Sequence, residues 1–337
     1  MSFEHYTFGV EEEFLWIPGT EPKGLPLFDL WDGQGKPGNF QVTREAHANV
    51  VEISSSIQHT LKDVAQHILT SRKWLNQQAE SVGASIFAGG THPDLRWQDM
   101  PLTTLPYYQN TLDEYQAALR SNFIFGLHTH IGGISKVQFP RVHNAMRCYL
   151  SLLIALSSNS SHWQGADTGL ACFRLSTFGR LPRTGTPPPM STVDEWMEEL
   201  AQRVRSKSIM TPTQVWHDAR YHPTYHTMEI RAMDMQTQPE TSAMVATFAM
   251  AIAMHLDMMG EILPLWRLPD WVIEENRWRA IRRGRSAMLL NELGEEIPIT
   301  ALFETLRERL GGFFIDLPVW FHAELDKVIR KSREVAA

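Results

Sequence analysis

The chain has 337 residues, of which 43% are hydrophobic and 20% charged, so it can bury a sizeable core and is not an intrinsically disordered chain. Its formal net charge of -7 excludes the basic field that non-specific nucleic-acid binding requires, and no nucleic-acid partner is expected. Its two cysteines, Cys148 and Cys172, exclude a disulfide framework and a cysteine-based zinc site, which predicts a reduced, cytoplasmic protein.

Hydrophobic periodicity predicts a mixture of helices and strands. The predicted helices begin after Thr60 or cover 142–157, 194–204, 241–259 and 300–310. The strand-like segments are 7–17, 49–55, 85–88, 123–134, 171–178 and 226–233. Because these elements show no regular β-α-β order, the sequence favours an α+β fold, in a single catalytic domain over 1–337.

Two proline- and glycine-rich stretches, 18–39 and 181–190, are predicted to be long loops. The N-terminus has no basic segment followed by an apolar stretch, so no secretion signal is expected. The longest apolar run, 243–259, contains His255 and Asp257 and is shorter than a membrane span requires. It is predicted to be a buried helix, with no membrane partner.

Acidic side chains share one face of two predicted strands, because residues i and i+2 of a strand point the same way. Glu11 and Glu13 lie on one face of the first strand, whereas Val10, Glu12 and Phe14 lie on the other. In the segment 49–55, Glu52 shares its face with residues 50 and 54. Read alone, residues 11–13 also fit an exposed strand end.

Two later strands repeat this one-sided pattern. His128 and His130 point to one side of their strand, and Glu229 shares a face with Arg231 on the last one. The histidines taken singly also fit ordinary core or surface positions. Together, however, the four strands predict one charged sheet face.

The four acids on this predicted face are too many for Arg231 alone to neutralise. Divalent cations would resolve the excess charge, and carboxylate oxygens with an occasional imidazole suit magnesium or manganese. Such ions commonly bridge to nucleotide phosphates. The arginine-rich segment 277–285 is, by contrast, typical of a solvated helix face.

Four segments in this order resemble signatures of the carboxylate-amine ligases related to bacterial and plant glutamate-cysteine ligases. They are 8–14 (FGVEEEF), 89–93 (GGTHP), 125–132 (FGLHTHIG) and 227–231 (TMEIR). Residues 164–168 leading to Arg174, and 275–280 leading to Arg282 and Gly284, also resemble family segments. The resemblance spans roughly residues 7 to 285.

The resemblance implies a glutamine-synthetase-like catalytic fold, in which a curved antiparallel sheet lines an active-site funnel and helices pack on its outer face. It implies ATP and Mg²⁺ inside the funnel. The implied metal ligands are Glu11, Glu13, Glu52, His130 and Glu229. His128, His130, Arg231 and Arg282 would bind the nucleotide, and Arg174 the acceptor carboxylate or the acyl phosphate, which makes Arg174 and Arg231 the expected catalytic residues.

The chain departs from the family pattern at Ala48, where many relatives carry an acidic or amide residue four positions before the glutamate that corresponds to Glu52. One metal ligand or substrate contact is therefore expected to be missing. The loop 181–190 matches no family feature, and it is expected, with 18–39, to shape the choice of acceptor.

The expected activity is ATP-dependent joining of a carboxylate, by default that of glutamate, to an amine, with release of ADP and phosphate. One alternative is a metal-dependent hydrolase built on His128 and His130. Another is a nucleotide- or amino-acid-binding module without turnover. The amine and the oligomeric state, with a homo-oligomer among the options, stay open.

Overall fold

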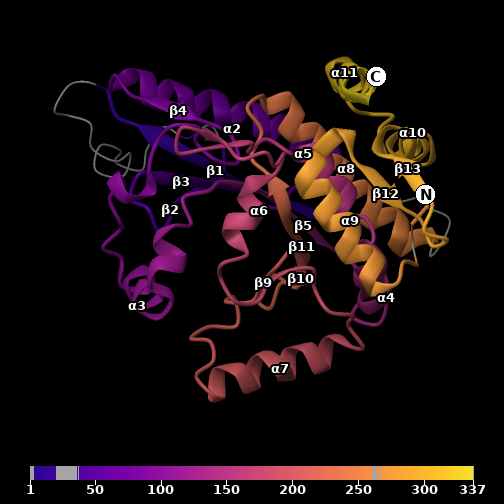
Figure 1. The fold of residues 1–337 in the computed structure, drawn as a ribbon, viewed down its shortest axis with the longest axis horizontal. Coiled ribbons are helices and arrows are strands. Elements are labelled where there is room, and N and C mark those ends of the chain that lie inside the picture. Colours follow the sequence, from indigo (N-terminus) through magenta and orange to yellow (C-terminus); the bar gives the residue numbers. More distant parts are fainter. Residues whose placement is uncertain (1–3, 20–35, 37, 260–263, 266, 337) are drawn as a thin grey trace.

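The computed structural model describes residues 4–19, 36, 38–259, 264–265 and 267–336, and its centre is one antiparallel sheet of seven strands (Figure 1). The strand order is β10-β11-β5-β1-β3-β2, and β4 pairs with the end of β1. The strands are β1 (Thr7–Ile17), β2 (Phe40–Arg44), β3 (Val50–Ser55), β4 (Ser85–Phe87), β5 (Gly126–Gly132), β10 (Ala219–Tyr221) and β11 (Met228–Asp234). A register shift between Ile230 and Met233 interrupts the β11–β5 pairing.

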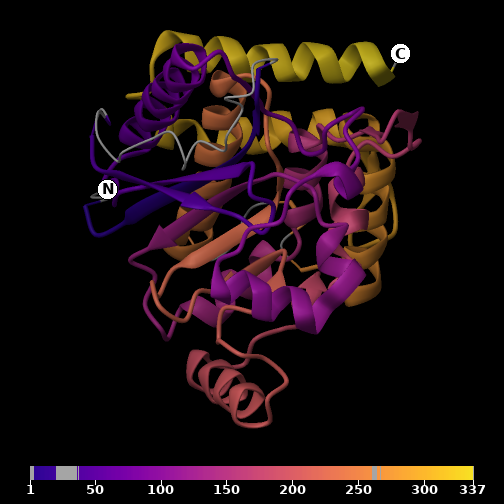
Figure 2. The ribbon, with the colours of Figure 1, turned by 90° about the vertical axis from the view of Figure 1, so that its left-hand side faces the viewer.

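Helices cover one face of this sheet, and α3 and α6 lie over the other face, where they line a cavity. Figure 2 shows α2 and the C-terminal helices above the sheet and α7 below it. The helices are α2 (Leu61–Ser81), α3 (Pro106–Arg120), α4 (Phe139–Met146), α5 (Leu150–Ser157), α6 (Phe173–Phe178), α7 (Val193–Arg205), α8 (Pro239–Met259), α9 (Asp270–Arg283), α10 (Ile299–Leu310) and α11 (Val319–Ala336). Short pairs complete the fold: β6 (His162–Trp163) with β7 (Ala166–Asp167), β8 (Thr184–Gly185) with β9 (Trp216–His217), and β12 (Met288–Leu290) with β13 (Glu296–Pro298).

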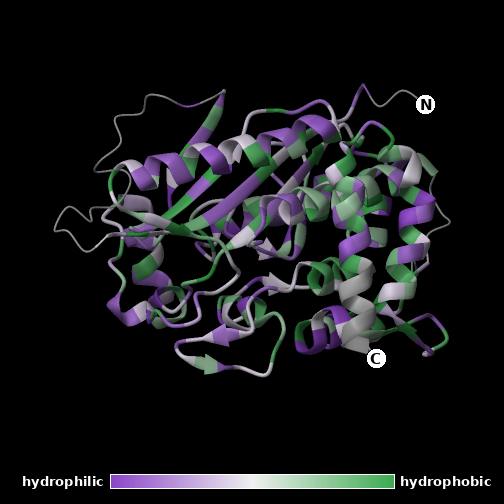
Figure 3. Cartoon of the chain, turned by 90° about the horizontal axis from the view of Figure 1, so that it is seen from above, coloured by the Kyte–Doolittle hydropathy of each residue, from purple (hydrophilic) through white to green (hydrophobic). Residues whose placement is uncertain are grey.

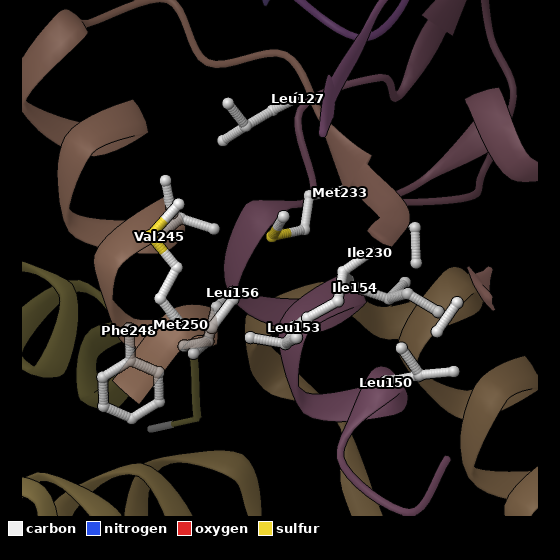
Figure 4. Close-up of a cluster of buried hydrophobic side chains, with 14 of the residues drawn as sticks. Leu127, Leu150, Leu153, Ile154, Leu156, Ile230, Met233, Val245, Phe248 and Met250 are labelled. Carbon is white, nitrogen blue, oxygen red and sulfur yellow. The ribbon is translucent and has the colours of Figure 1, made fainter. Parts of the chain in front are cut away.

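The sheet has one apolar and one charged face, as the alternation of residues predicted. Along β1, Phe8, Val10 and Phe14 are buried against the helical layer, whereas Glu11 and Glu13 are partly accessible on the other side. Side chains of β5, β11, α5 and α8 form the core in Figure 4. Full burial of each such apolar side chain contributes about 1.5–3 kcal/mol. The α+β fold with a one-sided antiparallel sheet is therefore confirmed.

Helix α8 is long and apolar enough to cross a membrane, but it lies inside the fold. Its most apolar 18-residue window is 89% buried, and it contacts α2, α4 and β5. Figure 3 shows hydrophobic and hydrophilic residues side by side along the outer helices, as expected where one helix face packs and the other meets water. The prediction of a buried helix is correct.

Several predicted boundaries differ from the structure. The weak strand expected at 171–178 is wrong, because this segment forms helix α6. Its first turn is fixed by tertiary contacts: Ser160 accepts hydrogen bonds from the backbone amides of Phe173 and Arg174. The predicted helix 142–157 is divided into α4 and α5. Residues 20–35 and 37 of the predicted loop 18–39 lie outside the described residues, and the loop 181–190 contains the short strand β8.

A buried ion pair joins the apolar sheet face to two helices. Arg72 of α2 donates hydrogen bonds to Glu12 of β1 at 2.7 and 3.2 Å, to Ser242 of α8 at 2.5 Å and to the Thr237 carbonyl at 3.2 Å. Glu12 and Arg72 are both almost inaccessible to solvent. The pair explains how a glutamate is tolerated among the apolar residues of β1.

Replacing Arg72 with methionine is expected to destabilise the fold by about 3–5 kcal/mol, because it leaves the Glu12 carboxylate buried without a partner. Urea unfolding would measure this loss. The double variant Glu12→Gln/Arg72→Met should recover part of it, since neither residue then carries an uncompensated charge. A single variant as stable as the wild type would contradict the role of the pair.

Candidate active site

The register of the sheet brings the predicted charged residues together. Glu13 lies directly opposite Glu52 across β1 and β3, and Glu11 lies opposite His128 across β1 and β5. Glu229 of β11 is the cross-strand partner of His130. Because opposite residues on one face have Cβ atoms about 4.5–5.5 Å apart, these side chains converge on one region.

A cavity of about 460 Å³ lies over this face. Its floor includes Glu11, Glu13, Glu52, His128 and Glu229, and its walls include residues of α3 and α6. A second hollow of about 330 Å³ adjoins it, shares Glu11 and Tyr225 with it, and is lined by His130. The predicted site residues on the sheet therefore line two neighbouring hollows, with Glu11 and Tyr225 between them.

Glu11 links the two histidines of β5. Its carboxylate oxygens lie 3.1 Å from His128 Nδ1 and 3.2 Å from His130 Nε2. Burial raises the pKa of Glu11, but His130 and His128 outweigh this effect and hold the pKa below its usual value. Burial lowers the pKa of His130, but Glu11 outweighs burial and raises this pKa above its usual value. Burial together with Arg231 lowers the pKa of His128.

Two groups of side chains have the geometry to hold a cation. One consists of Glu11, His128 and Glu229, and the other of Glu13, Glu52 and His128; in each, the ligand atoms lie within 4.8 Å of one another. His128 belongs to both groups, whereas the ring of His130 contacts Glu11 and, at 2.9 Å, the Thr227 hydroxyl. In this geometry His128 is better placed than His130 to bind a metal.

Glu45, which the sequence analysis did not single out, adds a fifth carboxylate to the cavity. It follows β2 directly and accepts a hydrogen bond from the Tyr108 hydroxyl at 3.1 Å. Burial and the nearby Glu13 raise its pKa to about 8. Burial and Glu11 likewise raise the pKa of Glu52 well above its usual value. Glu45 therefore supplies an acid to the cavity, although Ala48 replaces the acidic or amide residue that many relatives carry.

Arg220, also missed from the sequence, holds Glu229 together with Arg231. Its Nε and Nη2 donate to the two carboxylate oxygens at 2.5 and 3.1 Å, and Arg231 Nη1 donates to one of them. Burial raises the pKa of Glu229, but the two arginines outweigh burial and lower it well below the usual value. Arg220 lies on a strand of only three residues, too short for periodicity to reveal.

Arg174 enters the cavity from α6, where its guanidinium lies 5.9 Å from the centre of the Phe178 ring. It is 2% exposed, and in the described part of the chain no carboxylate lies within 4 Å of its guanidinium. Its Nη1 donates to the Arg231 carbonyl at 3.2 Å, its Nη2 lies 3.5 Å from His128 Nε2, and its Nε has no partner among described atoms. A buried guanidinium without a carboxylate in contact is expected to bind an anionic ligand.

Gly126 makes room for this arginine. A Cβ atom at Gly126 would collide with the Arg174 guanidinium and with the His128 ring. The glycine at the start of β5 is therefore required by the close approach of two side chains.

The structure does not bring Arg282 to this cavity. Arg282 lies on α9, and its guanidinium donates to the Gly169 carbonyl. It is absent from the residues that line either hollow in the described chain. Its assignment to the nucleotide phosphates gains no support from the geometry.

Comparison with known proteins places this site in context. A putative glutamate-cysteine ligase 2-3 of Rubrobacter xylanophilus is 32% identical over 334 residues, covering 97% of this chain and 89% of the relative. The glutamate-cysteine ligase of Haloferax volcanii is 32% identical and covers 90% of this chain and 86% of its own. A crystal structure of glutamate-cysteine ligase from Francisella tularensis in complex with AMP has a TM-score of 0.66 at 12% identity, covering 98% of this chain and 82% of that one.

The solved structure supports the glutamine-synthetase-like fold expected from the sequence. The sequence profile described as glutamate-cysteine ligase family 2 matches residues 7–311, which include every residue of the charged sheet face. This chain belongs to glutamate-cysteine ligase family 2.

Proposed function

We propose that the protein is an ATP-dependent carboxylate-amine ligase that activates the γ-carboxylate of glutamate and joins it to an amine. The γ-phosphoryl group of ATP passes to the carboxylate, and the amine then displaces phosphate from the acyl phosphate. The products are an amide, ADP and phosphate. The observation that carries this proposal is the buried Arg174, with no carboxylate within 4 Å in the described chain, beside two clusters of glutamates and His128 that can hold cations. The named activity of the relatives supports it.

The donor set fits magnesium or manganese. Hard carboxylate oxygens dominate it, and among the cavity carboxylates in the described chain only Glu229 has arginine partners. The raised pKa values of Glu45 and Glu52 reflect the same excess of buried negative charge. Bound magnesium would neutralise charge on the phosphates of ATP. Glu11, Glu13, Glu52, His128 and Glu229 would hold it, with His130 oriented behind Glu11.

Arg174 and Arg231 would orient the transferring phosphoryl group. Both guanidiniums line the cavity beside His128, and each has a buried Nε without a hydrogen-bond partner among described atoms. Donors that point into a buried site before the reaction stabilise developing negative charge with little reorganisation. No side chain needs to act as a nucleophile, because the phosphoryl group itself activates the carboxylate.

The adjoining hollow suits the nucleoside part of ATP. It is lined by Gly9 and Ile57 and by the hydroxyl side chains of Ser54–Ser56. It meets the main cavity at Glu11 and Tyr225, so a nucleotide that enters there would direct its phosphates toward His128 and Arg174. This arrangement leaves the α3 end of the main cavity for the amino acid and the amine.

Measurement of ADP and phosphate release tests the proposal. Purified protein would be assayed with ATP and Mg²⁺ against a panel of amino acids and amines, and parallel assays would omit Mg²⁺, the carboxylate or the amine. Release that requires glutamate, an amine and Mg²⁺ together is expected. Amide or ester hydrolysis with Zn²⁺, in place of any ADP release, would favour the hydrolase built on His128 and His130.

Magnesium is expected to raise the melting temperature more at pH 8 than at pH 6.5. Because burial and Glu13 raise the pKa of Glu45 to about 8, the metal-free folded state binds a proton more tightly than the unfolded state and loses stability as pH rises toward 8. A divalent cation on the neighbouring carboxylates removes this loss. His47 and His222, with pKa values of about 4, destabilise the fold only below about pH 6.5.

Thermal unfolding with MgCl₂ and with NaCl of equal ionic strength would measure the difference. In the variant Glu45→Gln, the effect of magnesium on the melting temperature should depend less on pH. A magnesium effect of the same size at both pH values would contradict this account of Glu45.

A further inference from the structure

Arg183 ties three segments together on the side of the cavity away from the sheet. Its Nη2 donates to the Tyr115 hydroxyl of α3 at 2.5 Å, and its Nε donates to the Gln214 carbonyl at 3.0 Å. Its guanidinium lies 5.7 Å from the Tyr115 ring centroid and 5.9 Å from that of Trp216, and these two rings meet edge to face. We call Arg183, Tyr115 and Trp216 the Arg183 clasp.

Two residues at the clasp have positive φ angles, which residues other than glycine rarely adopt. Arg183 has a φ of 61°, and Gln116, the neighbour of Tyr115, has a φ of 46° and interrupts α3. Such positions cost roughly 1–3 kcal/mol each and persist where surrounding structure enforces them, often at functional sites. The amide of Trp216 enforces one of them by donating to the Arg183 carbonyl at 2.8 Å.

The clasp holds one wall of the proposed active site. Residues Tyr107, Tyr108, Thr111 and Leu119, here called the α3 wall, line the cavity, and so does Trp216 itself. Tyr108 tethers the first half of α3 through its hydrogen bond to Glu45, whereas the clasp tethers the second half at Tyr115. Phe178 and Leu181 complete this end of the cavity. It is largely aromatic and aliphatic, with acids on the sheet below.

We propose that Arg183 is a positioning residue for the acceptor amine. It holds the α3 wall in the position that leaves room in the cavity for an apolar side chain on that amine. The aromatic lining favours such a side chain, and the acids below favour the ammonium group. Arg183 does not line the cavity, so its effect passes through Tyr115 and Trp216. The proposal rests on the ligase activity proposed above, of which it specifies the acceptor.

The test compares L-2-aminobutyrate, which has an apolar side chain, with hydroxylamine, which has none. In Arg183→Gln, the ratio of kcat/KM for aminobutyrate to that for hydroxylamine is expected to fall about tenfold, mainly through KM for aminobutyrate, since a cation-π contact and a hydrogen bond are lost. Tyr115→Phe should shift the ratio in the same direction. The double variant should change it no further than Arg183→Gln alone, because both substitutions remove the same contact. Arg180→Gln, an exposed arginine three residues earlier, is the matched control.

A second readout needs no activity. Backbone hydrogen exchange in α3 should accelerate in Arg183→Gln and stay unchanged in Arg180→Gln. An equal loss with both amines, an unchanged ratio, or unchanged exchange in α3 would overturn the role of Arg183. A wild-type protein that releases no ADP with either amine would instead count against the proposed ligase, and hydrogen exchange would still decide whether Arg183 positions α3.

Discussion

Replacing Glu13 with glutamine is expected to reduce ligase turnover by roughly 100- to 1000-fold, as removal of one electrostatic group from an active site typically does. The variant removes a negative charge from the group formed with Glu52 and His128. The side chain keeps its size, and an amide oxygen can still accept the hydrogen bond that Glu13 receives from the Gly126 amide. The loss is therefore expected without unfolding.

ADP release at several Mg²⁺ concentrations would measure the effect of Glu13→Gln, and urea unfolding would check the fold. The Mg²⁺ concentration for half-maximal activity should rise along with the loss of turnover. Glu80→Gln, which removes an exposed carboxylate at the end of α2, is the matched control and should behave as the wild type. Turnover of Glu13→Gln close to that of the wild type would remove Glu13 from the site.

The one-sided character of the sheet was predictable because strand periodicity is local. Glu11 and Glu13 share a face whatever their neighbours are, and the same holds for His128 and His130. Apolar residues on the opposite face then indicated which side is buried. The register that sets Glu13 opposite Glu52 depends on pairing between distant strands, and no local pattern encodes it.

The residues missed from the sequence lie where periodicity carries little information. Glu45 follows a five-residue strand whose outer side chains are polar, and Arg220 lies on a three-residue strand. The partner of Glu12 is 60 residues away on α2, so the sequence could assign Glu12 to the apolar face but could not show how its charge is compensated. The helical start at Arg174 similarly depends on Ser160, a contact outside the segment.

The structure also separates two arginines that the family resemblance placed in one site, Arg174 at the acceptor carboxylate or acyl phosphate and Arg282 at the nucleotide phosphates. Arg174 and Arg282 were both expected at the anionic substrates. Arg174 reaches the cavity because α6 crosses it, whereas α9 turns Arg282 toward the Gly169 carbonyl. Sequence spacing cannot distinguish these outcomes, because both residues lie on helices whose orientation is set by packing.

Glu229→Gln is expected to cost both activity and stability, unlike Glu13→Gln. Glu229 is buried between Arg220 and Arg231, so the amide leaves two guanidiniums without their carboxylate and should destabilise the fold by about 3–5 kcal/mol. Because the pKa of Glu229 lies well below its usual value, its contribution is present above about pH 4.5 and is lost as pH falls further.

Urea unfolding of the two variants at pH 7 separates these roles, since each removes one carboxylate from the same sheet face. Glu229→Gln should have a lower urea midpoint than both Glu13→Gln and the wild type. The triple variant Arg220→Gln/Glu229→Gln/Arg231→Gln should recover stability but not turnover, because it removes the unpaired charges together with the groups that orient the phosphoryl transfer. Equal midpoints for Glu229→Gln and Glu13→Gln would show that other groups stabilise Arg220 and Arg231. Glu229 would then contribute to the reaction and not to stability.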